Sequence, residues 1–371
     1  MSFQIDFVNF SQQMIPTLTI ELIGHYSING NSQYLDNLSQ LKYYVPPSNP
    51  NNVNFDLIKN FESTHHKSTE HTKLDNLLRW ISNHFDRLDR PLSTQKERWL
   101  DIDFIFDRGA IKTILSSPYK KNDGWIICAS KYRGTIYLCK FYTDKKEYQE
   151  ANRTLLEQQT CSSGYKFEQY MVADHPAHKP DPSLSLNECE EFLCMFKAKF
   201  GNHSLLYSAE IDGIVSQQFI TDTLIGKTFE IIELKTFPMY NKNGDIFFFS
   251  QERISEWWNQ SYLADIKRII CGLKDKNNIV RMIKEYPVCS LPKLPKWSCD
   301  MNRCKIFCNR FLNKIKRIVI KDHNECMYKF HWNPSTKNVV NYNEEAPDHE
   351  KYFFLKPWFV DKAEEYKKHS Q

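Results

Sequence analysis

Residues 205–214 read LLYSAEIDGI, an apolar run that two carboxylates interrupt. A short run of this kind predicts a buried strand. Side chains two positions apart in a strand point to the same face, so Glu210 and Asp212 are expected to project together while Ile211 faces the other way. Two carboxylates buried side by side are unfavourable unless a cation neutralises them, so this strand is expected to do more than fill a core.

A second charged strand is predicted at residues 227–237, KTFEIIELKTF. Glu233 and Lys235 share one face of this strand, and Leu234 lies on the other. Taken alone, an acid and a lysine at this spacing are typical of a cross-strand ion pair on a wet surface. Taken with Asp212, which lies 21 positions before Glu233, they match the pattern of the PD-(D/E)xK nucleases.

The residue types in this pattern suit metal-assisted phosphate chemistry. Carboxylates hold Mg²⁺ or Mn²⁺ through hard oxygen ligands. The metals lower the pKa of a bound water and neutralise the charge that builds up on the phosphate. A neighbouring lysine can orient the water or stabilise the phosphate oxygens. The alternative is a pair of surface strands with paired charges, which the spacing alone does not exclude.

A third acidic segment strengthens the nuclease interpretation. Residues 164–170, GYKFEQY, alternate so that Lys166 and Glu168 share one face of a predicted strand. Glu168 would then complete a cluster of carboxylates with Asp212 and Glu233. This expectation depends on three strands that meet at one place.

An arginine follows another apolar strand. Residues 102–110 read IDFIFDRGA, which places Arg108 at the end of the strand and Gly109 in a tight turn. A guanidinium at this position can bind a phosphate through two parallel hydrogen bonds. The alternative is a structural salt bridge from Arg108 to Asp107 or Asp103.

Taken together, the motifs resemble those of the DXO decapping exoribonucleases. That family shows an arginine-glycine after a strand, a Gly-Φ-x-Φ-Glu motif, a Glu-Φ-Asp motif, a Glu-Φ-Lys motif and a later helix glutamine. This chain carries all of them in order, as Arg108-Gly109, Gly164 to Glu168, Glu210-Ile-Asp212, Glu233-Leu-Lys235 and Gln260 in WWNQSYL. Flanking stretches are similar too, so the resemblance covers about residues 18–280: ELIGHYSI at 21–28, KLDNLLRWI at 73–81, KTILSSPY at 112–119, KYRGTIYL at 131–138 and FGNHSLLYSAEID at 200–212.

The resemblance implies two mixed β-sheets flanked by helices, a PD-(D/E)xK nuclease-like core and an active site in a cleft. It implies two divalent cations, Mg²⁺ or Mn²⁺, held by Glu168, Glu210, Asp212, Glu233 and the backbone carbonyl of Leu234. The catalytic residues would be Glu210, Asp212, Glu233 and Lys235. The RNA 5′ end would be bound by Arg108, Gly109, Lys235 and Gln260.

The family's activities imply an RNA 5′-end hydrolase. Such an enzyme releases incomplete caps, 5′-pyrophosphate or NAD, leaves a 5′-monophosphate and in some members degrades the strand from 5′ to 3′. Two alternatives stay open. The chain could be a weakly catalytic or non-catalytic partner that stimulates a separate 5′→3′ exoribonuclease, or it could be a DNA nuclease that shares the same site.

Composition sets the remaining limits. The 371 residues include 41% hydrophobic and 25% charged residues with a net charge of +4, which is the mix of a folded globular protein. We expect one nuclease domain over 1–371, with residues 281–371 as a helical and loop extension of that domain. The sequence shows neither an export signal nor an apolar stretch long enough to span a membrane.

The cysteines point to a reducing compartment. Eleven cysteines without an export signal favour reduced thiols in the nucleus or cytoplasm. Cys299, Cys304 and Cys308, with Cys326 downstream, lack the paired spacing of a zinc ribbon, so buried free thiols are favoured over structural zinc.

Periodicity and turn signals place the other elements, and the mixture of strands and helices indicates an α/β or α+β architecture. The predicted helices are 74–88, 188–200 (ending at Gly201), 251–270 (capped by Ser250) and 302–320. The predicted strands are 101–107, 125–132, 135–142, 164–171, 204–215 and 226–237.

Overall fold

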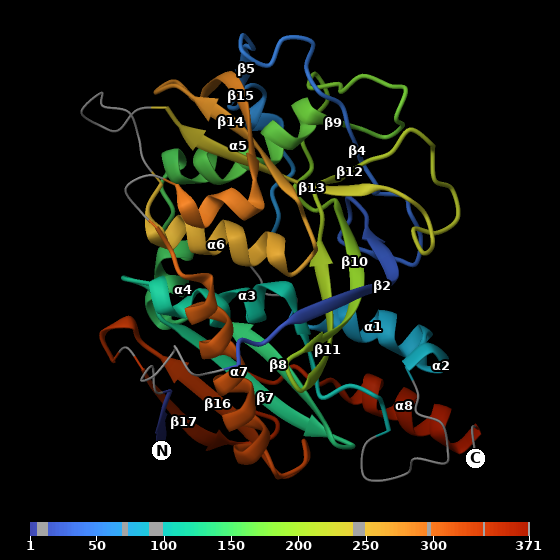
Figure 1. Cartoon of the computed structure of the whole chain (residues 1–371). Coiled ribbons are helices and arrows are strands. Elements are labelled where there is room, and N and C mark those ends of the chain that lie inside the picture. Colours follow the sequence, from blue (N-terminus) through green and yellow to red (C-terminus); the bar gives the residue numbers. More distant parts are fainter. Residues whose placement is uncertain are drawn as a thin grey trace.

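The computed structural model describes residues 1–5, 14–68, 73–88, 99–239, 249–294, 298–336 and 338–369. Within these residues the strands form two mixed sheets, one of ten strands and one of seven, with helices around both (Figure 1). The α/β architecture with two helix-flanked sheets is therefore confirmed.

The larger sheet, in the lower half of Figure 1, gathers strands from both ends of the chain. Its order is β1 (Ser2–Gln4), β17 (Val339–Glu345), β16 (Met327–Trp332), β7 (Trp125–Tyr132), β8 (Thr135–Phe141), β6 (Phe104–Asp107), β11 (His203–Glu210), β10 (Glu191–Phe200), β2 (Leu18–Ile28) and β3 (Tyr34–Leu35). The central strand β6 runs parallel to both β8 and β11. The carboxyl ends of these three strands therefore meet at one edge of the sheet.

The smaller sheet lies in the upper half of Figure 1. Its order is β5 (Phe55–Asp56), β15 (Ile279–Pro287), β14 (Arg268–Lys274), β13 (Glu230–Pro238), β12 (Gly213–Val215), β4 (Tyr43–Tyr44) and β9 (Val172–Ala173). The chain passes from the larger sheet to the smaller one between β11 and β12, through Ile211 and Asp212.

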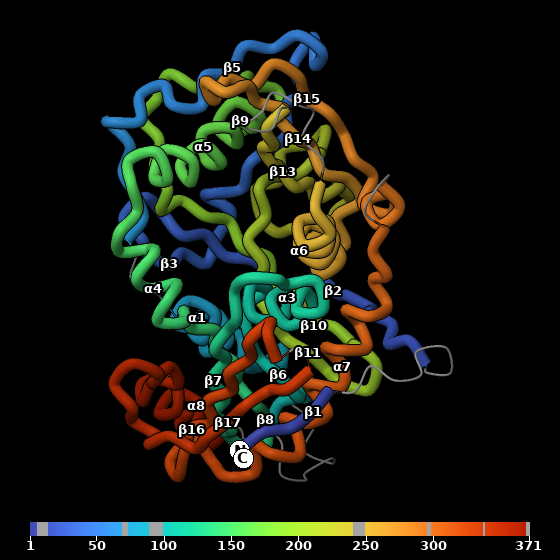
Figure 2. The backbone as a smooth tube through the Cα atoms, turned by 90° about the vertical axis from the view of Figure 1, so that its left-hand side faces the viewer, coloured from blue at the N-terminus to red at the C-terminus, as the bar shows by residue number. Residues whose placement is uncertain are grey.

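Helices cover the faces of both sheets. The α-helices are α1 (Asp75–Asn83), α2 (Phe85–Leu88), α3 (Arg108–Ser116), α4 (Asp144–Ala151), α5 (Leu155–Met171), α6 (Gln251–Tyr262), α7 (Met301–Ile318) and α8 (Pro357–His369). Short 3₁₀ helices are η2 (Phe61–Ser63), η4 (Ser117–Tyr119), η5 (Val288–Lys293) and η6 (Pro334–Thr336). Figure 2 shows α3 and α6 next to each other between the two halves of the molecule.

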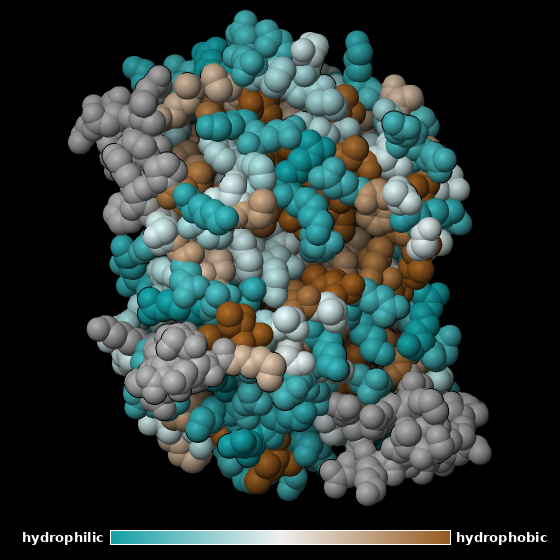
Figure 3. Space-filling model, viewed as in Figure 1, coloured by the Kyte–Doolittle hydropathy of each residue, from teal (hydrophilic) through white to brown (hydrophobic). Residues whose placement is uncertain are grey.

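The main hydrophobic core joins the two sheets. It contains Phe104 and Phe106 of β6 together with Phe237 of β13 and Ile269 of β14. The alternate residue Ile105 lies in a second core with α1 and α8 on the other face of the larger sheet. Both faces of β6 are therefore buried, which holds its carboxyl end rigidly. Figure 3 shows hydrophilic residues over most of one face, with hydrophobic residues gathered largely in the hollow between the upper and lower halves.

Several predicted elements are confirmed. Residues 74–88 form α1 and α2, and residues 302–320 correspond to α7. β7 and β8 form the predicted hairpin, in which Arg133 and Gly134 both adopt positive φ angles, of 44° and 77°. Ser250 caps α6, where its side chain accepts a hydrogen bond from the Arg253 amide at 3.2 Å.

The predicted helix at 188–200 is wrong, because residues 191–200 form strand β10. Phe192, Cys194 and Phe196 face the main core while the intervening Leu193 and Met195 face the second core, which is the period of a strand buried on both sides. Gly201 has a φ of +57° and lies in the turn between β10 and β11 instead of ending a helix.

Two further expectations need correction. The helix predicted over 251–270 ends at Tyr262, and its last residues begin strand β14. Residues 281–371 are not only helices and loops, since β16 and β17 add two strands to the larger sheet beside β7. Their pairing is with strands far away in the sequence, which local periodicity does not show.

Within the described residues, no helix has the length and the apolar character that crossing a membrane requires.

Candidate functional site

Glu233 lies at the centre of a charged cluster and is fully buried. Its Oε1 atom accepts hydrogen bonds from the side chains of Lys235 and Gln260. Its Oε2 atom accepts no hydrogen bond and lies 3.6 Å from Nη1 of Arg108. Burial disfavours the Glu233 charge, but the cations of Lys235 and Arg108 outweigh it, so the pKa of Glu233 is lowered. The carboxylate therefore stays ionised inside the protein.

Arg108 reaches this cluster from the junction between β6 and α3. The tight turn predicted here is wrong, because Arg108 and Gly109 begin a helix whose N-cap is Asp107. A Cβ atom on Gly109 would lie 2.8 Å from the Asp107 carboxylate, so the glycine leaves room for the cap. Arg108 does not pair with Asp107. Its Nη2 atom donates to the backbone oxygen of Glu210 at 2.6 Å.

Glu210 and Asp212 lie where the chain crosses between the sheets. The continuous strand predicted over 204–215 is interrupted here, since Glu210 ends β11 and Asp212 precedes β12. Asp212 is held from the neighbouring strand, because the Leu234 amide donates to its Oδ2 atom at 2.6 Å. The Leu234 side chain is buried in the core behind the strand, as the alternation predicts.

Glu168 reaches the same place from a helix. The strand predicted over 164–171 is wrong, because these residues end α5. Thr154 and Glu157 form a capping box that starts this helix, and Phe167 and Met171 point from it into the core at a spacing of four. Lys166 consequently faces away from Glu168 and donates to the Pro182 carbonyl at 2.7 Å.

A pocket of about 640 Å³ collects these acids. Its lining residues include Glu168, Glu190, Glu191, Glu210 and Asp212. Loss of solvent and the charge of Glu191 raise the pKa of Glu210 to about 8. Loss of solvent and the charge of Glu233 raise the pKa of Asp212 to about 6. The pKa of Glu168 is raised well above its usual value by desolvation and by the charges of Asp212 and Glu210.

The donor atoms of this pocket fit a hard divalent cation. Its acids offer carboxylate oxygens, the ligands that Mg²⁺ and Mn²⁺ prefer. Burial, and after it the repulsion between neighbouring acids, raises the pKa values of these carboxyl groups, and a bound cation would offset both effects. Glu233 also keeps one buried oxygen without a hydrogen bond. As the side chains are placed, no three histidines, cysteines, aspartates or glutamates among the described residues are close enough to hold an ion.

The cysteine group singled out in the sequence lies in the protein interior. All eleven cysteines are free thiols, and Cys299, Cys304, Cys308 and Cys326 lie buried in the main core. No metal-ligating group of three occurs among them in the described part of the chain.

Lys112 belongs to the site and was missed from the sequence. Its Nζ atom donates to Oε1 of Gln260 at 3.2 Å. This contact turns the amide so that its nitrogen faces Glu233. Burial and the cations of Arg108, Lys140 and Lys235 lower the pKa of Lys112 to about 8. Its place one helical turn after Arg108 is the signal that could have revealed it.

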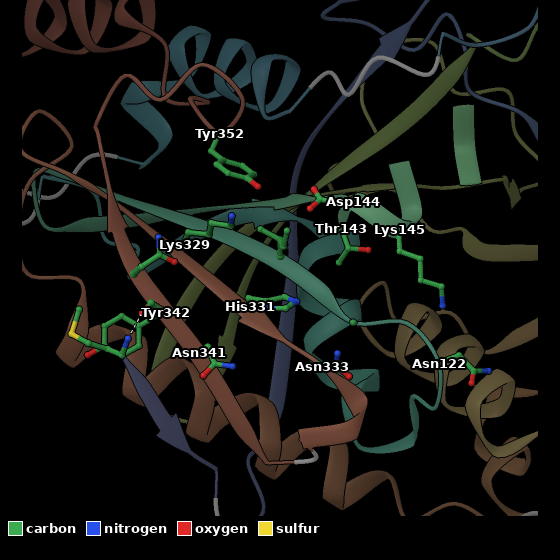
Figure 4. Close-up of a pocket in the computed structure, with 14 residues that line it drawn as sticks. Asn122, Thr143, Asp144, Lys145, Lys329, His331, Asn333, Asn341, Tyr342 and Tyr352 are labelled. Atoms are coloured by element: carbon green, nitrogen blue, oxygen red, sulfur yellow. Dashed lines mark hydrogen bonds between the residues drawn. The ribbon is translucent and has the colours of Figure 1, made fainter. Parts of the chain in front are cut away.

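A second pocket lies elsewhere, over β7, β16 and β17 (Figure 4). It measures about 610 Å³, and its lining residues are mostly asparagines, lysines and tyrosines with Asp144 as the one carboxylate among them. It therefore lacks the cluster of acids that a hydrolytic metal site needs.

Comparisons with known proteins identify the family. The family model described as RAI1-like PD-(D/E)XK nuclease matches residues 20–360. The chain belongs to this nuclease family. The match extends well beyond the resemblance seen over residues 18–280 and takes in β16 and β17 of the larger sheet.

Relatives and solved structures of the RAI1-like family span nearly the whole chain. The decapping and exoribonuclease protein of Bos taurus is 30% identical over 347 residues, which cover 91% of this chain and 84% of the relative. The structure of Candida albicans Rai1 in complex with pU5 and Mn²⁺ has a TM-score of 0.78 at 17% identity, and the match covers 98% of this chain and 100% of the other. Scheffersomyces stipitis Rai1 in complex with (3′-NADP)⁺ and calcium gives 0.76 at 17% identity, with coverages of 96% and 99%.

Membership of the RAI1-like family makes the chain a nuclease by descent. The resemblance inferred from the motifs is thereby confirmed, as are the PD-(D/E)xK core and the hydrolase class. The roles of the individual residues stay predictions. The structure nonetheless brings Arg108, Glu233, Lys235 and Gln260 into contact and places Glu168, Glu210 and Asp212 in one pocket.

Proposed function

We propose that this protein is a divalent-metal-dependent hydrolase of RNA 5′ ends. It would remove incomplete caps, 5′-triphosphate groups or NAD and leave a 5′-monophosphate, with 5′→3′ exoribonuclease activity on the product. The observation that carries the proposal is the gathering of Glu168, Glu210 and Asp212 in one pocket that borders the Glu233–Lys235 pair. The Bos taurus relative's name and the complexes of the yeast Rai1 proteins with pU5 and (3′-NADP)⁺ support the choice of substrate.

Mg²⁺ or Mn²⁺ would be held by Glu168, Glu210, Asp212 and Glu233, with the Leu234 carbonyl as a further ligand. When bound, the ions would supply an activated water and neutralise charge on the phosphate.

The chain's own residues prepare the substrate. Lys235 holds an ammonium beside Glu233, and although burial disfavours that charge, Glu233 and Asp212 raise the pKa of Lys235. It therefore stays protonated and can stabilise negative oxygens of a phosphate. Arg108 and Gln260 present further N–H groups from α3 and α6, and all three donors come from rigid elements that surround the buried Glu233.

Mn²⁺ is expected to stabilise the folded protein. At about a hundredfold excess over its dissociation constant, an ion that binds only the native state adds about 2.7 kcal/mol. We therefore expect Tm to rise by several degrees in thermal unfolding with Mn²⁺ compared with EDTA, and to rise much less in Asp212→Asn. An absence of any shift in the unmodified protein would favour the alternative of a non-catalytic partner of a separate exoribonuclease.

Lys112 is expected to raise kcat/KM by holding the Gln260 side chain in place. Lys112→Met removes the ammonium that fixes the Gln260 amide, so the amide can rotate and its nitrogen no longer faces Glu233 reliably. A lost hydrogen bond to a charged donor corresponds to about 1.5–3 kcal/mol, and we expect kcat/KM on triphosphorylated RNA to fall by roughly ten- to a hundredfold. The exposed neighbour Lys121 provides the control, and equal losses in Lys121→Met would contradict the role of Lys112.

Membership of the RAI1-like family favours RNA over DNA as the substrate. A 2′-deoxy strand of the same sequence separates the two, since the 2′-hydroxyl is the feature by which proteins distinguish RNA. Equal hydrolysis of both strands would favour the DNA nuclease interpretation.

We further propose that the protein acts in the nucleus or cytoplasm, where its free thiols would stay reduced.

A further inference from the structure

A row of aromatic rings lies in the loops that follow β9 and β12. The ring centroids of Phe219 and His175 are 4.6 Å apart, and those of His175 and His178 are 4.7 Å apart. Tyr43 lies behind Phe219 at 5.9 Å. We call Phe219, His175 and His178, with Tyr43 behind them, the ring row. Figure 1 shows the two loops next to each other at the right-hand side of the smaller sheet.

The ring row is buried and fixed at Tyr43 and becomes exposed from Phe219 onward. Phe219 is 50% exposed, whereas Tyr43 is 1% exposed. The Tyr43 hydroxyl accepts a hydrogen bond from the amide of Ile220 at 2.8 Å and so holds the backbone next to Phe219. The Nδ1 atom of His175 accepts the Ala177 amide at 3.1 Å, which fixes that ring within its own turn.

The ring row borders the pocket of the acids. His178 and its neighbour Lys179 line the same pocket as Glu168, Glu210 and Asp212. Lys179 forms no ion pair within the described residues, whereas Lys42, which also lines the pocket, pairs with Asp174 at 2.5 Å. The pocket therefore has, besides its acids, the last ring of the row next to an available cation.

We propose that the ring row is a stacking platform for a base of the single-stranded RNA whose 5′ end enters the acid pocket. A flat nucleobase suits exposed rings held in a fixed orientation, and a backbone phosphate suits the ammonium of Lys179. Aromatic rings next to a cation are the combination by which proteins bind single strands without reading their sequence. This inference rests on the proposed function, because it takes RNA as the substrate, and it adds a contact that none of the acids can make.

A stacked base has a spectroscopic signature. We would bind 5′-monophosphorylated oligoribonucleotides that carry 2-aminopurine at one of the first six positions, with Ca²⁺ in place of Mn²⁺ to slow turnover. Fluorescence of the base analogue is quenched when it stacks. At one position we expect quenching that Phe219→Leu removes and Phe219→Trp retains. Phe219→Leu should weaken binding of that strand roughly tenfold, the effect of losing one stacked base.

A strand with an abasic site at that position supplies the decisive comparison. Phe219→Leu should leave its affinity unchanged, because there is no base to stack. Equal weakening of the base-bearing and abasic strands would overturn the proposal, since it would show a general disturbance of the loop. Lack of a responsive position would overturn it as well. Ile225→Ala, an exposed apolar residue of the same loop outside the ring row, is the matched control.

The two proposals can fail separately. Hydrolysis by the unmodified protein and its loss in Asp212→Ala test the proposed function. The difference between base-bearing and abasic strands tests the ring row and needs no turnover.

Discussion

Asp212→Ala is expected to abolish hydrolysis of every RNA 5′ end while the protein stays folded. Asp212 lies at the crossing between the sheets, and its Oδ2 atom is held by the Leu234 amide at 2.6 Å. Removal of this carboxylate would take away one of the proposed metal ligands. A bound divalent ion supplies several kcal/mol of charge stabilisation in the transition state, so kcat should fall at least about a thousandfold.

Stability and activity should separate in this variant. Burial disfavours the negative charge of Asp212, and Glu233 repels it. Loss of the carboxylate therefore removes these unfavourable effects together with one hydrogen bond. Unfolding in EDTA should therefore be nearly unchanged, measured by denaturant titration. Asp222→Ala is the control, because Asp222 is an exposed carboxylate outside the pocket that pairs with Lys227 at 3.3 Å. Retained turnover in Asp212→Ala would refute the assigned centre.

Glu233→Ala is expected to abolish activity and to destabilise the fold at the same time. The buried Glu233 faces Arg108 and Lys235. Its removal leaves two cations without their shared partner, and breaking a buried pair in this way costs about 3–5 kcal/mol. The free energy of unfolding measured in urea with EDTA should fall by about that amount.

Glu233→Gln separates charge from shape. The amide oxygen can still accept hydrogen bonds from Lys235 and Gln260, so this variant should lose clearly less stability than the alanine variant. It should lose a comparable part of its activity, because a neutral oxygen is a poor ligand for a hard cation. Equal stability of the two variants would show that the hydrogen-bonding oxygen contributes nothing and that the loss of stability comes entirely from the Glu233 charge.

The charged motifs were predictable from the sequence because their geometry is local. Glu233 and Lys235 are two positions apart on one strand, and the alternation of a strand is enough to place them together. Arg108 could likewise be placed at the end of β6. The family pattern then supplied Gln260, whose contact with Glu233 depends on two elements that are not adjacent in the sequence.

The predictions were wrong where a helix and a strand have similar apolar patterns, or where a contact joins residues far apart in the sequence. Seven residues around Glu168 alternate like a strand, and the signal for the helix lies upstream, in the capping box of Thr154 and Glu157. Residues 191–200 form a strand that is buried on both faces, so their apolar residues do not alternate with polar ones and were mistaken for those of a helix. Lys112 contacts Gln260 across 148 positions of sequence, and its place one helical turn after Arg108 was the only local signal that it belongs to the site.

The passage of the chain between Glu210 and Gly213 has a broader consequence. One acid is anchored in the larger sheet and the next is tied to the smaller one, so neither sheet alone determines how the two carboxylates are oriented toward each other. That orientation also depends on the apolar residues that pack between the sheets. A change of side-chain volume deep in this packing would alter the reaction without touching a reacting group, and natural selection on turnover therefore extends to residues that never meet RNA.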